Sequence, residues 1–349
     1  MNNSIDGSTW LEASLPVSMG GLGIRRTERI ALPAFMASIH SVQALVLSIY
    51  PESDLDSVVN GGLDHWPLLT SAELPVPALR RQHRAWDLPV VTEEFGSLMD
   101  QSDMTSKARL MAVPTKASAT WLHALPASPL GNLLDDNTLR ISVWLRLGSR
   151  LCQLHMCCCG EVVDKYGLHG LSCLKSAARH RRHASLNESV RRALVSEQVP
   201  AVLEPLGLPR DDGLIPHGKT MIPWKNGKEL VWDVTVAKSY VGKTSEKMGA
   251  AAEDAEERKI QKYQGIASQY LFVPLGFETF RSWRPAATEL IGKKLVEFCF
   301  ETRSLQYFKQ RLSLDIQRGN AFCVMGTAKE TKGLKEIFRF CILGRTVST

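Results

Sequence analysis

The sequence predicts an α/β fold, with one small sheet in the C-terminal part and a mostly helical N-terminal part. Three observations predict it. Asn226-Gly227 lies between two strand-like apolar runs, and Asn-Gly is the strongest short-range signal for a tight β-hairpin. Five of the eight cysteines fall between Cys152 and Cys173, ahead of the predicted sheet. The elements expected after these cysteines are helix, strand, strand, strand, helix and strand, which places four strands in one sheet with a crossover helix.

Composition and the N-terminal sequence set the broad class of protein. A chain of 349 residues is long enough for two domains that each bury a core. Hydrophobic residues at 44% and charged residues at 22% are typical of a soluble globular protein. No uninterrupted apolar run of about 18 residues occurs, and no basic segment leads into an apolar one at the N-terminus. We therefore expect no membrane contact and an intracellular location, nuclear or cytoplasmic.

Positive charge is concentrated in the later part of the chain. Residues 1–100 hold six arginines, no lysine and twelve acidic residues, a balance of −6, so the remainder must carry +12 to give the net charge of +6. A basic segment suits a polyanionic partner such as nucleic acid. An ordinary solvated surface is the alternative, and charge alone favours neither.

The first 150 residues are expected to form a segment over 1–62 and a helical linker region over 63–150. A glycine-rich turn at 20–23 precedes an apolar helix at 28–50, which Thr27 could cap, and an acidic linker follows at 51–62. Prolines separate the later helices (Pro89, Pro114, Pro126 and Pro129). Asp135 and Asp136 are expected to cap a helix at 137–147 rather than to bind metal.

A set of soft metal ligands follows at 151–177. Cys157, Cys159, His169 and Cys173 form the pattern C-x-C-x9-H-x3-C. Three thiolates and one imidazole suit a tetrahedral zinc ion, and four protein ligands leave no open position, so we expect a structural site. Cys158 could replace either neighbouring cysteine as a ligand. A cysteine-rich loop without metal is the alternative, although clustered thiols without a secretion signal favour metal.

The C-terminal domain is expected over 178–327, with a basic tail at 328–349. Its predicted elements are a helix (178–198), a strand (201–205), a turn (209–213), the hairpin (218–236), a long helix (247–269), a strand (270–278) and two helices (285–302 and 304–325).

Carboxylates and lysines in this domain form a candidate hydrolytic site. Asp233 lies in the middle of an apolar strand, where a carboxylate is costly unless something pairs with it. Glu204 ends the first strand, and Lys259 and Lys262 lie about one turn apart on the crossover helix. The carboxylates could hold Mg²⁺ or Mn²⁺, and a lysine could position or activate water for phosphodiester cleavage. A hydrogen-bonded structural aspartate and a solvated lysine face are the alternatives.

A basic run begins the helix after the cysteines. Arg179, Arg181, Arg182 and His183, with His180 among them, could grip the phosphates of a nucleic acid. A helix N-terminus prefers acidic side chains, so this run is unusual for a helix start. We expect nucleic-acid contact, and a solvated surface is the alternative.

Several strings occur in the order found in one family. LPVSMGGLGIRR at 15–26 resembles the segment that follows the reverse transcriptase domain in non-LTR retrotransposon polyproteins, and CCCGEVVDKYGLHGLSC at 157–173 resembles their CCHC zinc knuckle. Five later strings resemble the restriction-like endonuclease region of these polyproteins: RHASLNESV, EPLGL, WDVTV, AEERKIQKY and QRLSLDIQRGNA. The resemblance covers about residues 10–327.

The resemblance implies a restriction-endonuclease-like αβββαβ core and a PD-(D/E)xK nuclease that nicks target DNA. It implies DNA as the partner, the element's RNA as a second partner, and no small-molecule substrate. Cys157, Cys159, His169 and Cys173 fall on the knuckle ligands, Asp233 falls on the D/E position, and Lys259 or Lys262 supplies the lysine.

One departure from the pattern of this family is serious. Its Pro-Asp-Gly falls on Pro216-His217-Gly218, so His217 stands where the first metal carboxylate is expected, and imidazole is a poor Mg²⁺ ligand. No Tyr-x-Asp-Asp of a polymerase is present. The sequence leaves open whether the chain is an active enzyme. The alternative is a non-catalytic nucleic-acid-binding fragment that uses the zinc knuckle and the basic helix.

Overall fold

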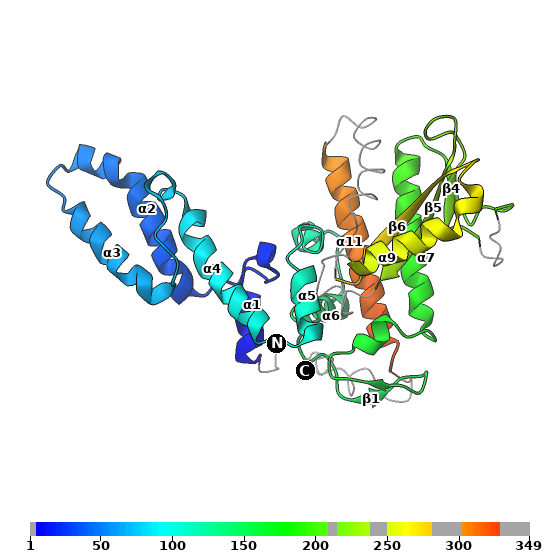
Figure 1. Ribbon diagram of the computed structural model, residues 1–349, viewed down its shortest axis with the longest axis horizontal. Coiled ribbons are helices and arrows are strands. Elements are labelled where there is room, and N and C mark those ends of the chain that lie inside the picture. Colours follow the sequence, from blue (N-terminus) through cyan, green and yellow to red (C-terminus); the bar gives the residue numbers. More distant parts are fainter. Residues whose placement is uncertain (1–4, 209–214, 238–249, 281–301, 329–349) are drawn as a thin grey trace, which may run out of the picture. The chain divides into compact units, whose positions relative to one another are not determined.

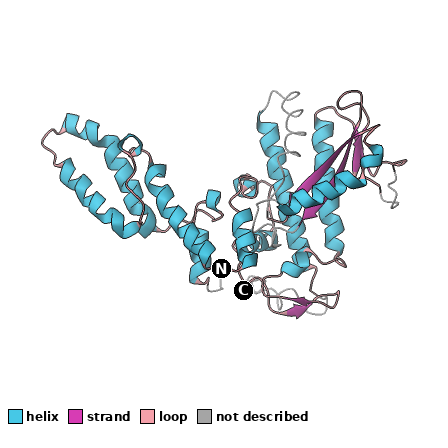
Figure 2. Cartoon of the chain, viewed as in Figure 1, coloured by secondary structure: helices cyan, strands magenta, loops and turns pink. Residues whose placement is uncertain are grey.

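A computed structural model describes residues 5–208, 215–237, 250–280 and 302–328, and these form two compact units (Figures 1 and 2). One unit is Ile5–Ser102, and the other begins at Asp103, inside the stretch that the sequence groups as one linker region. The described residues are mainly helical with a small mixed sheet, which confirms the α/β class. The turn predicted at 209–213 and nearly all of the helix predicted at 285–302 and of the tail lie outside the described residues.

The unit Ile5–Ser102 is helical. It contains α1 (Gly7–Ser14), α2 (Thr27–Ile49), α3 (Leu55–Leu69) and α4 (His83–Asp100), with short 3-10 turns at Val17–Met19 and Pro77–Leu79. Its core holds Met36, Trp66 and Trp86, and the two indole rings meet edge to face with centroids 5.2 Å apart. Thr27 is the first residue of α2 rather than its cap, which is Arg26.

Helix α2 is the one described helix that is long and apolar enough to cross a membrane by length and composition. Helices that contribute to the core of a bundle pass the same test, and α2 buries Pro33, Met36 and Ala37 within its own unit. The finding therefore leaves the expectation about membranes untested.

The second unit starts with α5 (Met104–Ala112), a 3-10 turn at Thr120–His123 and α6 (Asp136–Arg146). Asp135 Oδ1 accepts a hydrogen bond from the Thr138 amide at 3.0 Å, which confirms the predicted cap of this helix. The small hairpin β1 (His155–Met156) and β2 (Val162–Val163) and a 3-10 turn at Leu168–Leu171 follow.

The main sheet has the strand order β3 (Ala201–Leu203), β4 (Gly218–Thr220), β5 (Leu230–Ala237), β6 (Leu271–Glu278). Strand β4 runs antiparallel to both β3 and β5, and β6 runs parallel to β5. With α7 (Ala177–Ser196) before β3, α9 (Ala250–Lys262) between β5 and β6, and α11 (Thr302–Met325) after β6, the predicted order of elements is confirmed.

The tight turn has the backbone geometry that its residues predict. Asn226 and Gly227 both have positive φ, 51° and 73°, as a two-residue hairpin turn requires. The first arm is shorter than predicted, because β4 ends at Thr220 and residues 221–224 lie outside the regular ladder.

Helices cover both faces of this sheet (Figure 1). Along β5, Leu230, Trp232 and Val234 belong to the core formed with α7 and α11, whereas Asp233 faces α9. This alternation follows from the two-residue period of a strand. As a result Asp233, the one carboxylate of β5, faces the crossover helix α9.

Leu312 of α11 tests the importance of the packing between α7, α11 and the sheet. Its side chain is fully buried in this core. We expect Leu312→Ala to lower the free energy of unfolding by about 2–5 kcal/mol in urea denaturation, because the truncation leaves a cavity. Phe322→Ala, at an exposed position of the same helix, is the control. Equal losses in both variants would contradict the core assigned to α11.

Candidate functional site

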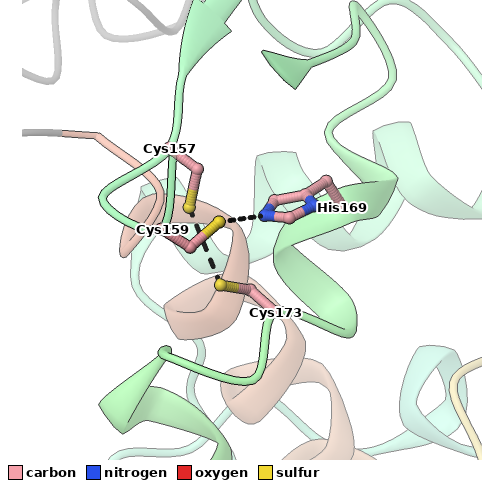
Figure 3. A group of neighbouring side chains, drawn as sticks. All are labelled: Cys157, Cys159, His169 and Cys173. Carbon is pink, nitrogen blue, oxygen red and sulfur yellow. Dashed lines mark hydrogen bonds between the residues drawn. The ribbon is translucent and has the colours of Figure 1, made fainter. Parts of the chain in front are cut away.

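Four side chains converge next to the small hairpin (Figure 3). The ligand atoms of Cys157, Cys159, His169 and Cys173 all lie within 4.8 Å of one another, and among the described residues this is the one such group of three or more. Cys157 Sγ lies 3.7 Å from Cys173 Sγ, and Cys159 Sγ lies 3.2 Å from His169 Nε2. Tetrahedral zinc with Zn–S bonds of about 2.3 Å sets two sulfurs roughly 3.7 Å apart. The cluster could therefore hold zinc with little rearrangement.

Two glycine turns bring these ligands together. Gly160, with a φ of 97°, closes the turn after the first two ligands, and its amide donates to the Cys157 carbonyl at 2.9 Å. Gly167, with a φ of 67°, begins the 3-10 turn that carries His169. Both φ values lie in the left-handed region that glycine adopts without steric cost. The sequence thus forms the site from one short stretch.

The neighbouring cysteines are not part of the group. Cys158, which the sequence offers as a substitute ligand, is exposed. Cys152 is buried, and its Sγ donates to the Asp164 carbonyl at 3.1 Å. Burial raises the pKa of Cys157 to about 12, so this thiol keeps its proton unless a cation binds.

A second constellation surrounds Asp233, whose side chain is 2% exposed. Lys259 Nζ and the Tyr263 hydroxyl donate to Asp233 Oδ2 at 2.5 and 2.9 Å, and His217 Nδ1 contacts Oδ1. The Val234 amide also donates to His217 Nδ1, at 2.9 Å. Burial alone raises the pKa of Asp233, but its contact with His217 and the charge of Lys259 outweigh burial and lower the pKa to about 2.

The structure brings together some of the predicted residues and separates others. Asp233, His217 and Lys259 meet, whereas the side chain of Lys262 is exposed to solvent. Glu204 follows β3 with a φ of 48°, and its amide donates to the His217 carbonyl at 3.0 Å, but its side chain is exposed. Its carboxylate does not join Asp233 in a metal-ligand group among the described residues.

Two members of this constellation, Tyr263 and His183, were not predicted from the sequence to lie there. Tyr263 lies four residues after Lys259, so the helical spacing could have indicated that both reach the same carboxylate. His183 comes from α7, and its ring centroid lies 5.9 Å from that of His217. No local pattern indicates that His183 lies near His217, because α7 and β4 are separate elements of the chain.

The basic run at 179–183 divides into surface and interior residues. Arg181 is exposed and Arg179 is partly exposed, as phosphate contact requires. Arg182 is 2% exposed and donates to Asn320 Oδ1 at 2.9 Å and to the Leu171 carbonyl at 3.4 Å. Its predicted role in nucleic-acid binding is therefore replaced by a structural one. Burial and neighbouring cations lower the pKa of His183 to about 3, so His183 brings no positive charge at neutral pH.

Comparison with known proteins adds no assignment. No protein-family model matches this chain, and no curated protein matches it. Functional inference therefore rests on the two side-chain constellations and on the sequence strings.

Zinc content tests the cysteine–histidine cluster. We expect the purified chain to hold about one zinc ion, measured by mass spectrometry of the metal, because its ligand set is complete. Cys159→Ser should abolish stoichiometric zinc, and a chelator should lower the thermal unfolding midpoint of the parent chain. Cys158→Ser is the matched control and should keep its zinc. Zinc loss in the Cys158 variant alone would show that the ligands are wrongly assigned.

The half-buried imidazole of His183 predicts acid sensitivity. Its pKa is about 3 in the folded state and near 6.5 in the unfolded chain. Between these values the unfolded chain binds more protons, so stability falls as the pH drops below about 6.5. We expect this residue to make the chain about 2 kcal/mol less stable at pH 5 than at pH 7.5. His183→Gln should reduce the pH dependence of the urea midpoint by this amount, and an unchanged dependence would refute the prediction.

Proposed function

We propose that this chain is part of a non-LTR retrotransposon polyprotein, and that its unit from Asp103 is a DNA endonuclease with a restriction-endonuclease-like core and a zinc knuckle. The observation that carries the proposal is the Asp233–Lys259 pair. A 2.5 Å contact joins a buried mid-strand carboxylate to a lysine of the crossover helix. Buried charged groups with strongly perturbed pKa values are typical of functional sites. The strings at 15–26, 157–173 and 182–321 support the assignment to this family.

The arrangement of elements supports the same assignment. A helix, three strands, a crossover helix and a fourth strand follow in the order expected of this class of nuclease. Asp233 lies on the central strand β5, and Lys259 reaches it from the helix between β5 and β6. The Cys157, Cys159, His169 and Cys173 cluster supports a structural zinc knuckle before the core.

The residues of this site suggest a role for each of them in phosphodiester cleavage. A bound Mn²⁺ or Mg²⁺ ion would supply Lewis-acid stabilisation of the scissile phosphate. Asp233 and His217 would hold the ion, and a ligand set of one carboxylate and one imidazole suits Mn²⁺ better than Mg²⁺. Lys259 would place positive charge beside the attacking water and the phosphate, and Tyr263 fixes the orientation of the Asp233 carboxylate.

A second candidate function is nucleic-acid binding without cleavage. It is favoured by the protein contacts of Asp233, because both carboxylate oxygens already meet side chains of His217, Lys259 and Tyr263. A carboxylate neutralised within the protein binds a cation less strongly. In this case the zinc cluster and Arg181 would contact the nucleic acid, and the Asp233 cluster would only stabilise the sheet.

Plasmid nicking separates the two functions. We expect the chain to nick supercoiled DNA with Mn²⁺ and more slowly with Mg²⁺. Asp233→Ala and Lys259→Ala should each lower the rate about a hundredfold or more. Lys262→Ala is the matched control, because this lysine is exposed and lies three residues further along the same helix. His217→Asp should raise the rate with Mg²⁺, because it restores a second carboxylate.

Two other outcomes would reject parts of this proposal. Salt-dependent DNA binding with no nicking by the parent chain or by His217→Asp would reject the nuclease and support the binding function. Equal rates for the parent and His217→Asp would reject the assigned effect of the histidine.

A further inference from the structure

A cavity of about 270 Å³ lies beside residues 157–173, the segment that carries the four candidate zinc ligands and is called the zinc loop below. Its walls come from four segments of the second unit: the start of α5, the end of α6, the zinc loop and Phe280 after β6. No residue of the Asp233 constellation lines it. Small-molecule sites usually have volumes of about 300–1,000 Å³, so this cavity is suited to a single planar ring system.

Three aromatic side chains from different segments of the chain line this cavity. Trp144 comes from α6 and Tyr166 from the zinc loop, and Phe280 is buried at 7% exposure. Aromatic rings bind nucleobases by stacking, and every base has a face for it. Lys165, next to Tyr166, places its Nζ 5.1 Å from the centre of the tyrosine ring. The ammonium group thus lies over one face of the tyrosine ring, and from there it could meet a backbone phosphate outside the cavity.

Hydrogen bonds join three charged groups of the cavity to backbone atoms. Arg109 is 8% exposed, and its Nη1 donates to the Arg146 carbonyl at 2.5 Å. Gly148 makes room for this guanidinium, since a Cβ there would lie 2.4 Å from Arg109 Nε. Asp103 accepts the Ser106 amide at 2.7 Å, and Asp164 accepts the Tyr166 amide at 3.1 Å. Side chains fixed in this way can discriminate between ligands.

The charges in the cavity indicate which part of a nucleotide enters it. Two carboxylates and one guanidinium line the walls, so the balance is negative and opposes entry of a phosphate. A carboxylate accepts hydrogen bonds, and it pairs with the amino group of a base such as cytosine N4. Thymine has the same size, but it presents the acceptor O4 at that position.

We propose that this cavity binds one unpaired base of a single-stranded nucleic acid and prefers cytosine to thymine. Tyr166 and Trp144 contact the base faces, Asp164 accepts from the amino group, and Lys165 meets the backbone outside. The inference rests on the proposed function only in taking nucleic acid as the partner. It adds a site for an unpaired strand that is separate from the site of cleavage.

Binding without Mg²⁺ or Mn²⁺ tests this site independently of nicking. The zinc-loaded full chain is titrated by fluorescence anisotropy with oligodeoxycytidylate and oligothymidylate of equal length at neutral pH. We expect about tenfold tighter binding of the cytosine oligomer. Asp164→Asn should remove this preference, because an amide can donate to thymine O4 as well as accept from cytosine. Its Oδ1 can still accept the Tyr166 amide, so the loop should keep its shape.

Variants of Tyr166 test the stacking. Tyr166→Ala should weaken both oligomers about tenfold, whereas Tyr166→Phe should bind as the parent does. Zinc content and the thermal midpoint of each variant verify that it is folded. Equal affinity of the parent for both oligomers, or unchanged binding by a folded Tyr166→Ala, would overturn the inference. A chain that nicks DNA but shows no base preference rejects only this site, and one that shows the preference without nicking rejects only the nuclease.

Discussion

The buried guanidinium of Arg182 joins the parts of the second unit. It donates to the Leu171 carbonyl in the zinc loop and to Asn320 of α11, and Asn320 Nδ2 in turn donates to the Thr279 carbonyl at 2.8 Å. The Thr279 amide donates to the Ala237 carbonyl at the end of β5, at 3.0 Å. A buried charge is tolerated only where hydrogen bonds replace its water, so these elements must assemble together. Gly319 permits the arrangement, because a Cβ there would lie 2.3 Å from Arg182 Cγ.

The two candidate metal sites differ in how much of each could be predicted from the sequence. The zinc ligands fall within residues 157–173, and local turns alone bring them together, so their spacing indicates the site. The Asp233 constellation takes side chains from α7, β5, α9 and the entry to β4. The apolar strand around Asp233 predicts that a partner exists. Which partner it has depends on how α9 packs on the sheet, and this packing selects Lys259 over Lys262.

The basic run shows where sequence patterns are insufficient. Arg179, His180 and Arg181 reach solvent at least in part, but the helical rotation of α7 directs Arg182 toward Asn320 of α11, which follows 138 residues later. Charge composition carries no information about a partner so distant in the chain. The length of β4 could not be predicted for the same reason. Its three residues form a strand because they pair with β3 and β5. Local signals were sufficient for the cap of α6 and the turn at Asn226-Gly227, where the interacting groups are close neighbours in sequence.

The packing of α7 on α11 has a consequence for synthesis of the chain. The apolar face of α7 (Leu186, Val190 and Leu194) packs against residues of α11 that are synthesised more than a hundred residues later. These are Phe308, Leu312 and Ile316. The parallel pair β5–β6 also waits for the whole of α9, and contacts between distant segments form slowly. The zinc loop, by contrast, is complete once Cys173 has left the ribosome. During translation a metal ion bound by these ligands would therefore order this loop first, while the apolar face of α7 stays uncovered and open to chaperones until α11 emerges.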